Sequence, residues 1–217
     1  LDVLPSHLQR PQTVFWHIQL GNQDDRAIPF RYEGNASWML DLKSSLNLFG
    51  KEPLDWEIYR GDSFQLLVPA KKALYAAILI KAALKQFPKL DVRIAIGIGN
   101  VSYRAAKITE ASGDAFLRSG ACFDSLKKQT LRISSENDAL NECLNLMFDL
   151  AQLTMNSWSV IEAQTIHTAM LHPDKSQLEL AQILGKSQSS VSEALNRGGF
   201  EEILKMERYY QQQILSV

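Results

Sequence analysis

The residues of this chain best suited to recognition chemistry lie in one polar segment near its C-terminal end. They are short hydroxyl and amide side chains flanked by one lysine and one arginine: Lys186, Gln188, Ser189, Ser190, Ser192, Asn196 and Arg197. Groups of this kind donate to phosphate oxygens and to base edges in the major groove of double-stranded DNA. The sequence therefore predicts a helix over residues 188–197 that contacts a duplex.

The residues around this segment have the spacing of a helix-turn-helix. Ala181 is small enough for a second helix to cross closely, and Gly185, four residues later, suits the turn. Apolar side chains that would lock the two helices together are Leu180, Leu184, Val191 and Leu195. Ser187 is a suitable N-cap for the second helix. Two other interpretations remain open: a helical hairpin that only packs, and a degenerate motif that contacts protein.

Charge limits how strongly such a motif can bind DNA. The chain of 217 residues has 23 Lys and Arg against 24 Asp and Glu, a formal charge of −1. Residues 135–217 contain eleven acidic and five basic side chains, a charge of −6. A single copy should therefore bind weakly and with a shallow salt dependence. Dimerisation would double the contacts, so we expect a homodimer.

Composition excludes several other classes of protein. With 46% hydrophobic and 22% charged residues, the chain is an ordinary globular protein. Two cysteines cannot form a disulfide framework, and the four histidines show no metal-binding spacing. The longest apolar run, residues 74–80, is too short to span a membrane, and no secretion signal is visible. These features predict a cytoplasmic protein without membrane contact.

The elements that precede the polar segment alternate between helix and strand. Hydrophobic periodicity predicts helices near residues 38–49, 76–87 and 116–126, a hairpin over 56–68, and strands at 92–99 and 131–133. In the strand 92–99, isoleucine and valine alternate with arginine, alanine and glycine. One face therefore belongs to a core, and the other allows close approach of a helix, backbone or ligand. The order predicts an α+β sandwich with helices on one side of an antiparallel sheet.

Four zones follow along the chain. Residues 1–36 are rich in proline and glycine, and their pattern predicts only one strand, near residues 14–20. Residues 37–134 form the α+β domain. Residues 135–157 form a connector helix that is apolar nearly all round, which predicts burial on two sides. Residues 158–217 form the helix-turn-helix domain.

Several motifs in order resemble the SatD family of bacterial proteins. They are residues 56–65 (WEIYRGDSFQ), 91–99 (DVRIAIGIG), 107–110 (KITE), 113–120 (GDAFLRSG) and 189–195 (SSVSEAL). The resemblance covers roughly residues 37–215. It implies a bacterial transcriptional regulator with a C-terminal helix-turn-helix.

The first half also resembles the catalytic domain of class III nucleotidyl cyclases, a ferredoxin-like sandwich. That resemblance makes Asp62, in the hairpin's Gly-Asp pair, a metal carboxylate, but magnesium would need a second carboxylate as well. Leu117 and Ala121 stand where cyclases place an Asn and an Arg, so catalysis is not expected. A degenerate domain would serve as a sensor of a small-molecule effector or as a dimerisation platform. Alternatively, Asp62 centres a nucleotide- or metal-binding module, or it is only a turn residue.

Overall fold

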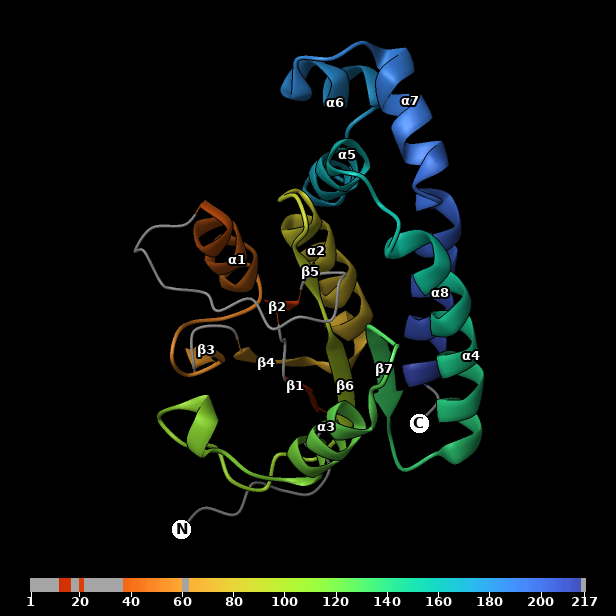
Figure 1. The fold of residues 1–217 in the computed structure, drawn as a ribbon. Helices are drawn as coiled ribbons and strands as arrows, with labels where there is room; N and C mark the ends of the chain where they lie inside the picture. The colour runs from red at the N-terminus through yellow and green to blue at the C-terminus, as the bar shows by residue number, and fades with distance from the viewer. Residues whose placement is uncertain (1–11, 17–19, 22–36, 60–62, 216–217) are drawn as a thin grey trace.

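The computed structural model describes residues 12–16, 20–21, 37–59 and 63–215. A five-stranded sheet has the strand order β3-β4-β1-β6-β7, and a two-stranded sheet pairs β2 with β5 (Figure 1). The strands are β1 (Gln12–Trp16), β2 (Leu20–Gly21), β3 (Trp56–Tyr59), β4 (Ser63–Pro69), β5 (Asp91–Val92), β6 (Ile94–Gly99) and β7 (Leu131–Ser134). A strand near residues 14–20 is thus found as β1, although residues 17–19 lie outside the described part.

Helices dominate the second half of the chain. They are α1 (Ser37–Asn47), α2 (Ala73–Lys85), α3 (Asp114–Ser125), α4 (Asp138–Met155), α5 (Val160–Leu171), α6 (Gln177–Leu184), α7 (Gln188–Arg197) and α8 (Phe200–Leu215). The predicted α+β class is confirmed, and the predicted helices near 38–49, 76–87 and 116–126 correspond to α1, α2 and α3. Within the described residues, no helix combines the length and the apolar character needed to cross a membrane.

The hairpin follows the sequence pattern closely. β3 and β4 are antiparallel, with Trp56 opposite Leu66 and Tyr59 opposite Ser63. Pro69 ends β4, and a short 3-10 turn leads directly into α2. The turn that contains Asp62 lies outside the described residues.

The sheet differs from the prediction in two respects. β7 runs parallel to β6, so the sheet is mixed rather than wholly antiparallel. Helices also cover both faces: the isoleucines of β6 join the core around α2, whereas Ala95 packs with Cys122 and Leu126 at the α3 side. Both corrections have one cause, because α3 forms the crossover between β6 and β7, and parallel neighbours need such a connection.

The bare face of β6 allows α3 to pack very closely. A Cβ atom added at Gly97 would lie 2.3 Å from the carbonyl oxygen of Ala115 and 2.5 Å from the backbone nitrogen of Ser119. No side chain fits there without movement of the helix backbone. The sequence allowed a helix, another backbone segment or a ligand to approach this face, and the structure shows a helix there.

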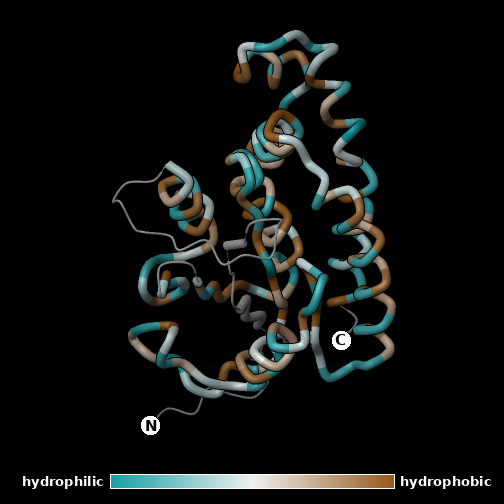
Figure 2. Tube along the Cα trace, in the orientation of Figure 1, coloured by the Kyte–Doolittle hydropathy of each residue, from teal (hydrophilic) through white to brown (hydrophobic). Residues whose placement is uncertain are grey.

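The hydrophobic core is continuous from α1 to α8. One cluster of buried side chains includes Leu42 of α1, Leu79 of α2, Phe148 of α4, Ile166 of α5 and Tyr210 of α8. Apolar residues accordingly concentrate along α2 and β6 in the middle of the molecule (Figure 2). The α+β part and the helical part therefore share one core.

α4 is not buried on two sides as its composition predicts. Its inner side carries Leu144 and Phe148, both fully buried, but Leu146, Leu150 and Leu153 are 63%, 62% and 74% exposed. The prediction was wrong because the helix meets β7 and α8 on one side only. Its opposite side remains an apolar surface.

Amide side chains of α4 complete the hydrogen bonding of the edge strand β7. Asn145 Oδ1 accepts from the backbone N–H of Ile133 at 2.9 Å, and Asn145 Nδ2 donates to the backbone carbonyl oxygen of Ile133 at 2.9 Å. Gln152 does the same for Leu131, at 2.9 and 3.1 Å. An edge strand needs such cover because its unpaired backbone groups otherwise offer a template for another chain. The amides also fix α4 in register with the sheet.

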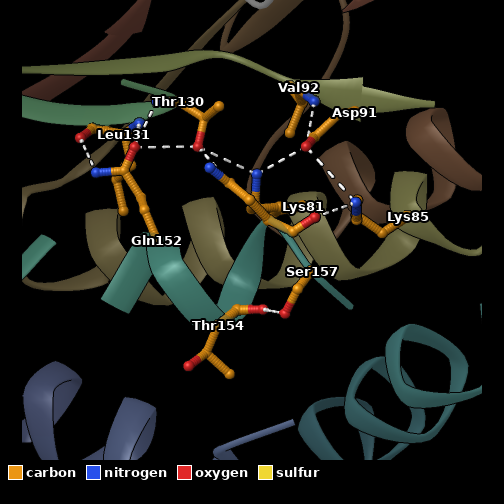
Figure 3. A network of polar contacts seen from close by, with 10 residues as sticks. Lys81, Lys85, Asp91, Val92, Thr130, Leu131, Gln152, Thr154 and Ser157 are labelled. Atoms are coloured by element: carbon orange, nitrogen blue, oxygen red, sulfur yellow. Dashed lines mark hydrogen bonds and ion pairs between the residues drawn. The ribbon is translucent and has the colours of Figure 1, made fainter. Parts of the chain in front are cut away.

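A buried ion pair extends this network to α2 (Figure 3). Lys81 Nζ donates to Asp91 Oδ1 at 2.7 Å and to Thr130 Oγ1 at 3.3 Å, and Thr130 Oγ1 lies 3.1 Å from Gln152 Oε1. Burial lowers the pKa of Lys81, and Asp91 opposes that effect. The network joins α2, β5 and α4 around this ion pair, and Lys81 would be costly to leave unpaired in its buried position.

Candidate nucleic-acid interface

α6 begins and ends at well-defined caps. Ser176 Oγ accepts from the backbone N–H of Glu179 at 3.3 Å, and Glu179 Oε2 accepts from the backbone N–H of Ser176 at 2.8 Å, which forms a capping box. The hydrogen bond from the Ser176 backbone N–H, followed by those from the Ser176 hydroxyl and the Lys175 ammonium, lowers the pKa of the Glu179 carboxyl. At the other end Gly185 has φ of 63°, in the left-handed region that favours glycine.

Gly185 turns the chain so that α7 can start three residues further on, at Gln188. The backbone N–H of Lys186 donates to the carbonyl oxygen of Ala181 at 2.9 Å, which closes the turn. Ser187 then caps α7, with its Oγ accepting from the backbone N–H of Ser190 at 3.2 Å. The predicted roles of Gly185 and Ser187 are confirmed by this geometry.

The two helices pack mostly through the side chains that the spacing predicts. Leu180 and Ala181 of α6 are buried, as are Val191 and Leu195 of α7, and Ala194, which the spacing did not indicate, is buried beside them. Leu184 is only partly buried. α5 packs against both α6 and α7 and supports them from the side opposite the exposed face of α7.

The opposite side of α7 is open. Gln188, Ser189, Ser190, Asn196 and Arg197 are exposed, and Ser192 is half-buried. α6 and α7 lie at one end of the molecule, beyond the end of α4 and away from the sheet (Figure 1). Within the described residues, the α+β part does not cover this polar face.

Five of the candidate side chains already have partners within the protein. The hydroxyls of Ser189 and Ser190 lie 3.0 and 2.8 Å from the hydroxyl of Ser187. Lys186 Nζ donates to Gln164 Oε1 at 3.0 Å, and Gln188 Nε2 donates to Gln177 Oε1 at 3.0 Å. The amide oxygens that accept these two hydrogen bonds are uncharged, so they orient Lys186 and Gln188 without cancelling the charge of Lys186.

Arg197 is held more firmly. Its Nε lies 3.1 Å from Glu162 Oε1, and another guanidinium nitrogen lies 2.9 Å from Glu193 Oε1. Two carboxylates therefore compete with any phosphate for this cation. Glu193 stands four residues before Arg197, a spacing that the sequence reveals. No sequence signal indicates Glu162, which lies 35 residues away on α5.

The residues considered for nucleotide chemistry are not brought together in the same way. Leu117 and Ala121 are exposed on α3. Arg118 donates to the carbonyl oxygen of Ile98 at 2.7 Å and lies 3.8 Å from Glu136, so it joins α3 to the end of β6. Asp62 lies outside the described residues, and the magnesium site stays a prediction. The described residues contain no cluster of three His, Cys, Asp or Glu side chains able to hold a metal ion.

Comparisons with known proteins leave the family open. No family model and no curated protein matches this chain. Among solved structures, the crystal structure of a regulator of polyketide synthase expression from Bifidobacterium adolescentis is similar at 16% identity. The match covers 94% of this chain and 80% of that chain, with a TM-score of 0.24, too low to establish a common fold. The resemblance to the SatD family therefore stays a prediction.

Proposed function

We propose that this chain is a cytoplasmic transcriptional regulator that binds double-stranded DNA through a helix-turn-helix formed by α6 and α7. The observation that carries the proposal is the open face of α7, where exposed serine and amide side chains lie opposite the buried Val191, Ala194 and Leu195. A helix with one side fixed on a scaffold and one polar side free can enter the major groove. Lys186 and Arg197 flank it as phosphate contacts.

Residues 37–134 then serve as a sensor or dimerisation platform without catalytic activity. The strand order β3-β4-β1-β6, with α1 after β1 and α2 after β4, supports a ferredoxin-like arrangement of these elements. The engagement of Arg118 by Ile98 and Glu136 supports the absence of catalysis, because this cation is then occupied within the fold. The shared core offers a route by which a small-molecule effector bound to the first part would act on the second.

Fluorescence anisotropy with labelled genomic duplexes at low salt tests the proposal. We expect Gln188→Ala and Arg197→Ala each to weaken binding by about fivefold, since each removes a contact worth about 1 kcal/mol. Lys107→Ala is the matched control: it also removes one exposed cation, but from the α+β part, where Lys107 precedes the short 3-10 turn Ile108–Glu110. That variant should bind as the parent chain does.

The same experiment separates the remaining interpretations of the motif. Equal losses in Arg197→Ala and Lys107→Ala would mean that only overall charge matters, and they would contradict a specific role for α7. Failure to bind any duplex at low salt would favour the reading of α7 as a protein-contacting helix.

A further inference from the structure

The uncovered side of α4 carries a regular apolar row. Ala139, Cys143, Leu146, Leu150 and Leu153 follow one another in steps of four, three, four and three residues, and all five are exposed. This spacing is that of the a and d positions of a coiled coil, which face a partner helix. We call this row the α4 seam.

A groove borders the α4 seam. α8 lies beside α4 (Figure 1), and between them is a cavity of about 320 Å³. Its lining is mostly apolar and consists of Met147, Leu150, Ala151, Thr154, Gly199, Glu202, Ile203 and Met206. A ridge of leucines and a hollow thus lie side by side on one face. A two-fold axis would place the ridge of one copy against the hollow of the other, as an isologous interface requires.

Charge and size both point to a second copy of this chain as the occupant. The five side chains of the α4 seam are uncharged. Of the acids beside the seam and the groove, Asp149 is paired with Arg132 at 3.1 Å and Glu202 with Lys205 at 3.6 Å, which leaves the exposed Glu142 at the margin. The 18 residues of α4 extend about 27 Å, and two adjacent helices span about 20 Å. A face of this size covers about 540 Å². Two copies would therefore bury about 1,100 Å² in total, just above the roughly 1,000 Å² that a specific interface needs.

We propose that the chain forms a homodimer through the α4 seam and the adjoining groove, with a two-fold axis parallel to α4. The interface itself follows from the exposed leucines and the groove. The direction of the axis rests on the proposed function: a parallel axis puts both α7 helices at the same end, where they can reach successive major grooves on one side of a duplex. A perpendicular axis would put them at opposite ends.

Sedimentation velocity over a range of protein concentrations tests the interface without DNA. We expect the parent chain to dimerise and Leu150→Glu to raise the dissociation constant at least about 100-fold, because two like charges replace two buried leucines. Leu117→Glu is the matched control, since Leu117 is 74% exposed on α3, as exposed as Leu153 on α4. A monomeric parent chain, a dimer that Leu150→Glu leaves intact, or equal losses in Leu150→Glu and Leu117→Glu would overturn the interface.

Cys143 tests the direction of the axis. It is the exposed one of the two cysteines, whereas Cys122 is buried and its burial raises the thiol pKa to about 11. In the parallel dimer each Cys143 lies at the same height as its copy. A short bismaleimide should therefore link the parent chain into a covalent dimer but leave Cys143→Ser unlinked. A dimer that does not cross-link would overturn the parallel axis, and cross-linking without duplex binding would keep the dimer while removing the proposed function.

Discussion

At the scale of single residues, Arg197 shows how a candidate contact can be restrained by its surroundings. Its guanidinium is 55% exposed yet lies within salt-bridge distance of Glu162 and Glu193. Exposed pairs of this kind contribute only about 0–1 kcal/mol. A DNA phosphate can therefore displace the two carboxylates, but breaking these salt bridges lowers the affinity of the protein for DNA.

Releasing this restraint should strengthen duplex binding. We expect Glu193→Gln to raise affinity about three- to tenfold at low salt, because it removes one competing carboxylate and one negative charge from the exposed face of α7. Anisotropy titration against the same duplexes measures the change. Glu201→Gln makes the same charge change on α8 and should have a smaller effect. Equal gains in the two variants would show that net charge, rather than Arg197, decides affinity.

A second residue makes stability depend on pH. His167 on α5 is largely buried, its Nε2 has no hydrogen-bond partner within the described structure, and burial lowers its pKa from 6.5 to about 4. Since the folded-state pKa lies below the unfolded one, the stability that neutral His167 contributes is complete above pH 6.5 and is lost as pH falls toward 4. We expect a loss of about 2 kcal/mol between pH 7 and 5. Urea unfolding at both pH values measures it, and His167→Leu should remove most of the difference. An unchanged difference in that variant would assign the effect to other groups.

At the scale of elements, the contact between α3 and β6 depends on glycine. We expect Gly97→Ala to destabilise the fold by about 1–3 kcal/mol, since its Cβ would collide with the backbone of Ala115 and Ser119. Gly120→Ala is the control: it lies on α3 with nothing within 4 Å of an added Cβ, so it should stabilise the helix by about 0.5–1 kcal/mol. Chemical denaturation measures both. Effects of the same sign would contradict this account of the packing.

Elements with a local signal were predictable, and those fixed by distant contacts were not. The hairpin of β3 and β4 follows from a Gly-Asp pair between two apolar runs, and the turn at Gly185 follows from one glycine in a fixed place. The parallel direction of β7 was missed, although a helix between two strands favours a parallel crossover. The amide contacts of Asn145 and Gln152 with β7 had no sequence signal. In the sequence of α4, Asn145 and Gln152 look like ordinary solvent-exposed polar residues of a helix.

The candidate site likewise has features that the local sequence predicts and features that depend on contacts between distant residues. The exposed polar face of α7 follows from helical periodicity, because Val191 and Leu195 must point inward. The partners of Lys186 and Gln188 could not be predicted, since Gln164 and Gln177 belong to other helices and only the packed arrangement brings them near. The exposed leucines of α4 were misread as a second buried side, because a row of leucines looks alike whether its own chain or a second copy covers it.

At the scale of the whole molecule, the salt dependence of DNA binding joins the α4 seam to α7. Each copy offers Lys186 and Arg197 as phosphate contacts, so a dimer that uses both copies would neutralise about four phosphates and a monomer about two. The slope of log K against log salt is about −0.9 for each contact, which predicts about −3.6 for the dimer and about −1.8 for a monomer. Leu150→Glu should therefore halve the slope, and Leu117→Glu should leave it unchanged. Anisotropy titrations at several salt concentrations measure these slopes. A slope that stays the same in Leu150→Glu, in a chain shown by sedimentation to be monomeric, would mean that the two α7 helices do not bind one duplex together.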